Sequence, residues 1–336
     1  MGLLNGGPFI NLQEWKMNMP YSDAKTLQLN RNRQVNDKKR KQIKVTIKAY
    51  LFLLPTILLI MTFSYYPALS AFYYSFTNWD GFQTAKIIGF KNFEIIFTSD
   101  EFRRAFLNLF WFSAFNVITA LTAPLLVALL IYKVKHAKLQ NMYRLLFVFP
   151  MVVPGMVTIL LWKFILNPDV GLLNSFLAAI GVPDERLPLW LASMKMALPS
   201  LLLVGFPWIS GVSVLIYLAG FQSIPVSLRE AAIVDGANGT TLFFRIELPL
   251  IMSQIKLIMI LTIISVLQTF SLQLVLTNGG PANTTTVPGY IMYREAVTNS
   301  QMGFACAIGV VLFIMIFILT VINNKFLKSS TEFDQN

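Results

Sequence analysis

Six long apolar blocks dominate this sequence and limit the folds that it can adopt. They lie near residues 49–75, 105–132, 145–166, 197–220, 250–276 and 303–324. Each block is about as long as the roughly 20 apolar residues that a helix needs to cross a bilayer. Charged residues make up only 13% of the chain, against about 25% in a typical soluble domain. The pattern predicts an all-α integral membrane protein with six transmembrane helices.

Basic residues orient the predicted helices. Residues 38–48 carry six Lys or Arg, and the 133–144 connection carries four and no acidic residue. The connections predicted on the opposite side hold seven basic and eight acidic residues in all. They are 78–104, 168–195 and 278–302. Since basic loops stay on the cytoplasmic side, we expect both termini and the 221–249 connection in the cytoplasm, in a multi-pass protein of the cell membrane.

The predicted domain organisation is simple. Residues 1–48 form a basic cytoplasmic extension, residues 49–325 the six-span membrane domain and residues 326–336 a cytoplasmic tail. The basic run directly precedes an apolar block, which favours anionic membrane lipid over nucleic acid as its partner. The sequence indicates no function for the first 40 residues.

The sequence lacks the residues that several kinds of chemistry require. His136 and Cys306 are the single histidine and cysteine, which argues against a metal site or a Cys/His nucleophile pair. No phosphate-binding loop or nucleophile elbow is present in the sequence. Acidic residues are nearly absent from the blocks, although ion-coupled carriers usually need them at mid-membrane. We therefore predict no catalytic residue, no metal and no cofactor, and disfavour a channel or a membrane enzyme.

Two features inside the blocks stand out: one charged residue and several prolines. Lys256 is the one charge well inside a block, and we predict a structural role at the inner interface. Prolines predict kinked helices around a cavity. They are Pro55, Pro124, Pro150, Pro154 and Pro207.

The segment 224–249 is unusual for a connection between spans. Pro225 and Ser227 can start a helix, with Glu230 as the partner of Ser227 in a capping box. Gly236 is expected to end this helix, and a second short helix is expected over 240–247. A small, charged tip of this kind suits insertion into a groove of another protein. The other interpretation is an amphipathic helix on the lipid surface.

The same segment resembles the EAA-type motif of permease subunits of binding-protein-dependent type I ABC importers. The matching residues are Glu230, Ala231, Ala232, Asp235, Gly236, Ala237, Phe243, Ile246, Leu248 and Pro249. The resemblance implies the permease fold of these importers, with a cytoplasmic coupling helix. It also implies that Glu230, Ala231, Ala232, Asp235, Gly236, Ala237, Leu248 and Pro249 couple the chain to an ATPase.

A second resemblance, over about residues 45–328, is to the maltose, oligosaccharide and glycerol-phosphate permeases. Its main part is an outer loop with Thr277-Asn278-Gly279-Gly280-Pro281, Tyr290, Arg294-Glu295-Ala296 and Gly303. The stretches 75–79, 144–150 and 167–174 add to it. The resemblance implies a non-catalytic transport subunit that imports a sugar. A permease of the same fold for a non-sugar solute is the alternative, which the outer loop disfavours.

Family resemblance also implies the partners. They are a second, homologous permease, two ATPase subunits that bind ATP and Mg²⁺, and an extracellular or periplasmic sugar-binding protein. A sugar needs hydroxyl partners and an aromatic face, which indicates Trp208, Ser265, Gln268 and Thr269 as candidate contacts. Such side chains also make ordinary hydrogen bonds between helices.

Overall fold

The computed structural model describes Gln42 and residues 44–326. The predicted extension and tail therefore lie mostly outside the described residues. The chain divides into two units, up to Leu69 and from Ser70 onward. One helix runs over Lys44–Tyr74. It contains a π-helical turn at Met61–Tyr65, and its last part, α3 (Tyr66–Tyr74), crosses from the first unit into the second. None of the side chains in its most apolar window is buried, as expected for a helix that faces lipid or a partner.

The second unit is all helical within the described residues, apart from a single antiparallel bridge between Thr77 and Ile87. Its first half contains α4 (Lys91–Thr98), α5 (Asp100–Tyr132), α6 (Ala137–Val148), η2 (Phe149–Val152), α7 (Gly155–Ile165), α8 (Leu172–Ala179), η3 (Asp184–Arg186) and α9 (Ala197–Leu203). Its second half contains α10 (Gly211–Ser223), α11 (Val226–Val234), α12 (Gly239–Leu242), η4 (Phe243–Glu247), α13 (Leu248–Leu250), α14 (Met252–Gln268), α15 (Ser271–Leu276), α16 (Pro288–Tyr293), η5 (Arg294–Thr298) and α17 (Met302–Phe326). The expected all-α class is confirmed.

Three helices are long and apolar enough to cross a membrane without a break: Lys44–Tyr74, Asp100–Tyr132 and Met302–Lys325. Three bent pairs reach the required length together. They are Ala137–Val152 with Gly155–Ile165 (86°), Gly211–Ser223 with Val226–Val234 (68°) and Gly239–Leu250 with Met252–Gln268 (65°). The described residues thus contain three candidate spans, or six if each bent pair crosses once.

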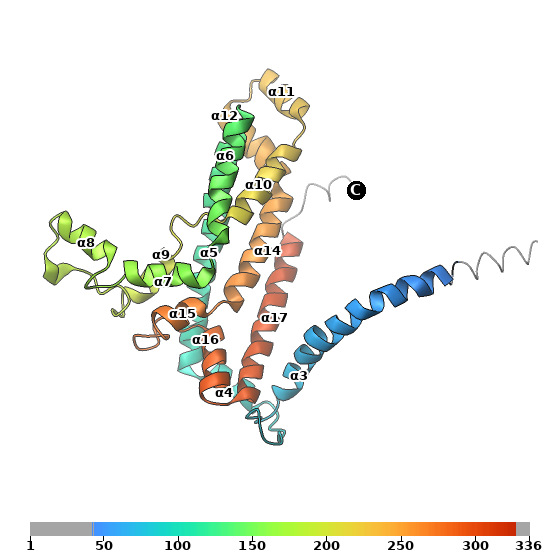
Figure 1. Ribbon diagram of the computed structural model, residues 1–336, viewed down its shortest axis with the longest axis vertical. Coiled ribbons are helices and arrows are strands. Elements are labelled where there is room, and N and C mark those ends of the chain that lie inside the picture. The colour runs from blue at the N-terminus through green and yellow to red at the C-terminus, as the bar shows by residue number, and fades with distance from the viewer. Residues whose placement is uncertain (1–41, 43, 327–336) are drawn as a thin grey trace, which may run out of the picture. The chain divides into compact units, whose positions relative to one another are not determined.

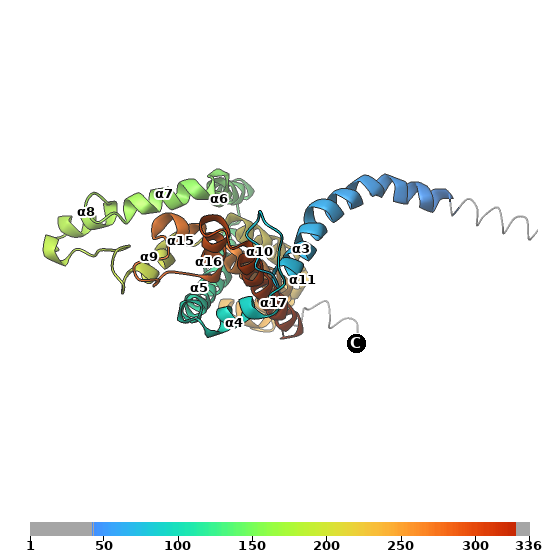
Figure 2. The same ribbon diagram turned by 90° about the horizontal axis from the view of Figure 1, so that it is seen from below.

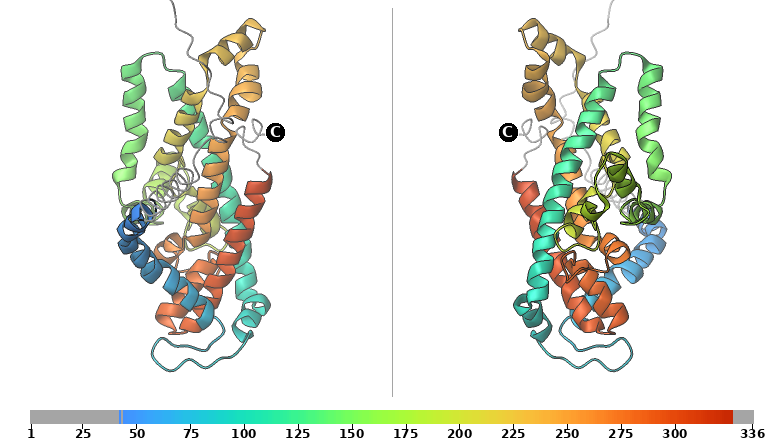
Figure 3. Two further views of the ribbon diagram at one scale, coloured as in Figure 1. Left: turned by 90° about the vertical axis from the view of Figure 1, so that its right-hand side faces the viewer. Right: turned by 90° about the vertical axis from the view of Figure 1, so that its left-hand side faces the viewer.

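The long helix α5 packs against α10 and α14, and α14 in turn packs against α17 (Figure 1). The helix α5 forms one side of the helix bundle in the second unit (Figure 2). Viewed along these helices, α7 and α8 extend to one side of them (Figure 2). One apolar core joins the N-terminal half of α5 to α16 and α17, and a second joins its C-terminal half to α10 and the start of α14. Both sides of this arrangement are visible in Figure 3.

The predicted spans differ from the structure where the backbone breaks. The third predicted span is interrupted at 153–154, between Pro150 and Gly155. The fourth is two helices, because residues 204–210 around Pro207 leave the helical conformation. The fifth is interrupted at 269–270. By contrast, α5 continues through Pro124.

Lys256 links two helices. Its Nζ donates a hydrogen bond to the carbonyl oxygen of Asn324 at 3.2 Å. This carbonyl belongs to the last turn of α17, where helix carbonyls lack partners within the helix. The Asn323 side chain donates in return to the Lys256 carbonyl at 3.4 Å. The two contacts join the first turns of α14 to the last turn of α17.

Candidate functional site

The segment 224–249 forms two short helical pieces around a glycine turn, as the sequence predicts. α11 and α12 lie at one end of the second unit, beyond the ends of α10 and α14 (Figure 1). The Asn238 side chain caps α12 by accepting a hydrogen bond from the Thr241 amide at 2.8 Å. The predicted capping box is wrong, because α11 already begins at Val226 and Ser227 lies inside it without a capping hydrogen bond.

Gly236 ends α11 in the left-handed conformation, with φ +87°. A Cβ built there would meet no atom within 4 Å. Glycine is therefore required for its backbone conformation and not for space. The amide of Ala237 donates to the carbonyl of Ala232 at 2.9 Å, which closes the end of the helix.

The residues of the EAA-type motif divide by exposure. Four of them face outward: Glu230, Ala231, Asp235 and Gly236. Their apolar neighbour Val234 is 86% exposed. Ala232, Ala237 and Leu248 are half-buried, and Pro249 is exposed in α13. The tip thus presents small, apolar and acidic groups on one open surface, which suits a groove in a partner.

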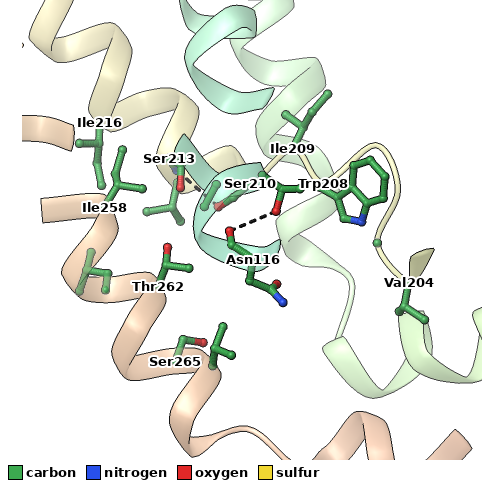
Figure 4. Close-up of a pocket in the computed structure, with 16 residues that line it drawn as sticks. Asn116, Val204, Trp208, Ile209, Ser210, Ser213, Ile216, Ile258, Thr262 and Ser265 are labelled. Carbon is green, nitrogen blue, oxygen red and sulfur yellow. Dashed lines mark hydrogen bonds between the residues drawn. The ribbon is translucent and has the colours of Figure 1, made fainter. Parts of the chain in front are cut away.

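A cavity of about 450 Å³ lies between α5, α10, α14 and the non-helical residues 204–210. Its polar lining consists of hydroxyl, amide and indole groups. They are Asn116, Thr119, Trp208, Ser210, Ser213, Thr262 and Ser265. Figure 4 shows Asn116 on one side of this space and Thr262 and Ser265 on the other.

A second cavity of about 200 Å³ adjoins the first. The two share Asn116, Val204, Ser265 and Val266 as lining residues. The second also reaches Thr269 and Gln273. Within the described part of the chain, no Asp, Glu, Lys, Arg or His lines either cavity.

Both cavities lie where predicted spans lose their helical backbone. Trp208 has φ +58° in the 204–210 segment. Its indole nitrogen donates to the Leu202 carbonyl at 2.9 Å, an acceptor at the end of α9. In the fifth predicted span, Thr269 is extended and its hydroxyl donates to the Ser265 carbonyl at 2.7 Å. Such breaks are tolerated at membrane depth where they line a cavity.

The four predicted sugar contacts lie in different places. Trp208 and Ser265 line the larger cavity, and Ser265 and Thr269 line the smaller one. Gln268 is exposed at the end of α14 and lines neither. Gln273 was not among these four contacts, yet it is only 3% exposed and its Oε1 has no hydrogen-bond partner. Asn116 was also missed, because a single Asn in an apolar block gives no signal.

The loop at 277–290 is held by its own side chains. The Thr277 and Thr285 hydroxyls are 2.7 Å apart, and the Thr286 hydroxyl donates to the Gly279 carbonyl at 3.0 Å. Gly279 has φ +79°, and a Cβ on it would lie 2.6 Å from the Thr286 hydroxyl. Asn108 of α5 donates to the Thr286 carbonyl at 2.9 Å. The loop's own hydrogen bonds and the bond from Asn108 hold it beside the N-terminal half of α5.

Residues 75–79 also serve packing. The Asn92 side chain donates to the carbonyls of Ser75 and Thr77 at 2.8 and 2.9 Å. The amide of Gly303 donates to the Trp79 carbonyl at 2.7 Å. The Trp79 ring stacks on Tyr74 with centroids 4.0 Å apart. The contact with Gly303 anchors residues 75–79 to the start of α17.

Comparison with known proteins identifies relatives of this chain. Residues 120–329 match the family model described as "Binding-protein-dependent transport system inner membrane component". The multiple sugar-binding transport system permease protein MsmF of Streptococcus mutans is 29% identical, over 82% of this chain and 94% of its own. The sn-glycerol-3-phosphate transport system permease protein UgpA of Escherichia coli is 30% identical, over 84% and 95%.

A solved structure is also similar. It is a crystal structure of a bacterial ABC transporter involved in the import of the acidic polysaccharide alginate. One of its chains matches with a TM-score of 0.73 and 25% identity, over 87% of this chain and 100% of that chain. The alginate transporter has also been solved in complex with an alginate pentasaccharide-bound periplasmic protein.

Proposed function

Because the chain belongs to the family of inner membrane components of binding-protein-dependent transport systems, we propose that it is the permease subunit of an ABC importer for an uncharged sugar. Its partners in this proposal are a second permease, two ATPase subunits and an external binding protein. The EAA-type residues around Gly236 supply the contact with an ATPase. ATP and Mg²⁺ bind to the ATPase subunits, and this chain moves the sugar without bond chemistry.

The observation that carries the proposal is the pair of adjoining cavities between α5, α10 and α14. Their volumes of about 450 and 200 Å³ suit a ligand of one or a few sugar rings. The hydroxyls of Thr262 and Ser265 and the amide of Asn116 can exchange hydrogen bonds with sugar hydroxyls, and Trp208 offers an apolar ring face.

The neutral lining favours an uncharged substrate. A carboxylate or phosphate that leaves water without a counter-charge loses several kcal/mol. The permeases named for glycerol-3-phosphate and alginate handle anionic solutes, whereas the one named for multiple sugars does not imply a charge. The wall that this chain contributes supports the uncharged class.

The topology and the docking role follow the same proposal. We place both termini and α11 in the cytoplasm and the 278–302 connection outside, as the basic loops favour. The exposed tip at Glu230, Ala231 and Asp235 then meets an ATPase on the cytoplasmic side.

Uptake by the full complex tests the proposal. Cells or vesicles containing the permease pair, the ATPases and the binding protein would receive labelled raffinose, a neutral trisaccharide, or trigalacturonate, an anionic one. We expect ATP-dependent uptake of neutral sugar and at least roughly tenfold less of the anion, which corresponds to about 1.4 kcal/mol. Uptake of the anion alone would overturn the uncharged class. ATP-dependent uptake of an amino acid or peptide, with no sugar uptake, would overturn the sugar assignment.

A further inference from the structure

Arg229 and Glu247, two residues outside the EAA-type motif, form an ion pair between α11 and η4. The Nε of Arg229 is 3.1 Å from Oε1 of Glu247, and the two side chains are 28% and 1% exposed. Arg229 belongs to α11 and Glu247 to η4, so the pair crosses the glycine turn at Gly236. A carboxylate this deeply buried is costly without a counter-charge. The two atoms make an ionic contact without a hydrogen bond between them, and the charge of Arg229 offsets that of the buried Glu247.

The same guanidinium contacts α5. Its Nη1 donates to the hydroxyl of Tyr132 at 3.2 Å, and its Cζ lies 5.0 Å from the centre of the Tyr132 ring. Tyr132 is the last residue of α5 and stacks on Phe221 of α10, with ring centroids 5.3 Å apart and planes at 17°. Phe221 is fully buried. Arg229 is thus held by a charge on one side and by an aromatic pair on the other.

These contacts connect α11 to the helices that wall the cavities. α5 carries Asn116 and Thr119 to the larger cavity, and α14 carries Thr262 and Ser265. Glu247 leads into α14, since the Ile251 amide donates to the Glu247 carbonyl at 3.2 Å and Ile251 is fully buried. A displacement of α11 that kept its contacts would therefore move the inner ends of both α5 and α14.

We propose that Arg229 is a positioning residue which, through Glu247 and Tyr132, passes the movement of α11 to α5 and α14. This proposal rests on the proposed function, in which α11 docks on an ATPase. Arg229 itself touches neither cavity, and its side chain lies on the inner face of α11 while Glu230 is exposed. Glu230 would make the outward contact and Arg229 the inward one.

The test compares uptake with ATP hydrolysis in the complete complex reconstituted in vesicles. Arg229→Met is expected to leave the subunits assembled and to lower the sugar imported per ATP hydrolysed by roughly tenfold, the usual scale of a coupling energy. Arg229→Lys keeps the charge beside Glu247 and should restore most of that ratio. Tyr132→Phe keeps the ring and loses the hydroxyl contact, so it should lie between wild type and Arg229→Met.

A double variant separates coupling from stability. Arg229→Met with Glu247→Leu removes the buried charge together with its partner, which often leaves stability unchanged or higher. We expect this variant to assemble and to remain poorly coupled. Wild-type import per ATP in the double variant, or in an assembled Arg229→Met complex, would overturn the proposal. If the wild-type complex itself showed no ATP-dependent sugar uptake, the proposed function would fail instead, whatever the variants did.

Discussion

Arg294 holds both carboxylate oxygens of Glu101, from Nη1 to Oε1 at 2.8 Å and from Nη2 to Oε2 at 3.1 Å. Arg294 begins η5 and Glu101 lies in the first turn of α5, so the contact joins segments 193 residues apart. The hydrogen bond to Glu101, followed by that to Glu295, raises the pKa of Arg294 above its usual range. At the other end of α5, Tyr132 accepts from Arg229. An arginine thus contacts each end of α5.

The contact between Arg294 and Glu101 should contribute measurably to stability. Arg294→Met removes a bidentate pair and leaves Glu295, whose side chain is 9% exposed, without its cation. We expect the free energy of unfolding to fall by about 2 kcal/mol. Thermal unfolding of the purified complex, followed by fluorescence, measures the change.

Arg103→Met is the matched control. Arg103 pairs with Asp100 at 3.1 Å, but the two side chains are 73% and 81% exposed. Solvent screens such a pair, so the change should stay within about 0.5 kcal/mol. Equal losses for the two variants would contradict the assignment of Arg294 as the anchor of α5.

The turn at Gly236 should matter for coupling and not for the cavity. Gly236→Ala forces an alanine to φ +87°, at a cost of roughly 1–2 kcal/mol. The turn would shift, so we expect weaker recovery of the ATPase subunits with the permease and lower uptake. Gly239→Ala is the control, because Gly239 has no positive φ and free space around it. Wild-type uptake by Gly236→Ala would remove the docking role from this turn.

Reversal of an exposed charge tests the same surface without backbone strain. Glu230 lies on the exposed side of α11 and makes no ion pair with another described residue. Glu230→Lys should therefore leave thermal unfolding unchanged and lower uptake by reducing the affinity for the ATPase. Co-purification at increasing salt gives the readout. A loss of stability equal to the loss of uptake would mean that Glu230 serves the fold instead.

Sequence patterns predicted the continuous helices best. Long uninterrupted apolar runs predicted α5 and α17 nearly at their observed bounds, and Gly236 ends α11 as expected. The breaks at 204–210 and 269–270 depend on contacts between distant residues. Trp208 packs against Phe115 of α5 with ring centroids 5.2 Å apart, and Phe270 stacks on Tyr293 with ring centroids 5.1 Å apart. No periodicity in one apolar block carries that information.

The same limit explains the missed polar residues. Arg229 and Glu247 are 18 residues apart (247 minus 229), and only the hairpin made by α11, α12 and η4 brings them together. Gln268 and Gln273 are alike in type and lie in one apolar block. The break between them decides which one is buried, so the block alone could not distinguish them.

Cysteine labelling can test on which side of the membrane the connections at Asn238 and Asn283 lie. Asn283 and Asn238 are both exposed, so a cysteine at either position would be open to a thiol reagent on its own side of the membrane. Cys306→Ala provides a background without a competing thiol. In intact cells, an impermeant maleimide should label Asn283→Cys and not Asn238→Cys. The reverse pattern would contradict the proposed cytoplasmic position of α11.

The two glutamines decide which part of the fifth predicted span contacts sugar. Gln273 lines the smaller cavity with an amide oxygen that has no partner, whereas Gln268 is exposed and lines neither cavity. A hydrogen bond to a sugar hydroxyl would satisfy the Gln273 oxygen, and a buried polar site of this kind discriminates strongly. Gln273→Leu should therefore raise the concentration of sugar-loaded binding protein for half-maximal uptake by roughly tenfold. Gln268→Leu makes the same chemical change and should stay within about twofold. Uptake measured over a range of loaded binding-protein concentrations separates the two. A large effect of Gln268→Leu with none of Gln273→Leu would place the sugar beside the end of α14, at one of the four contacts that the sequence indicates.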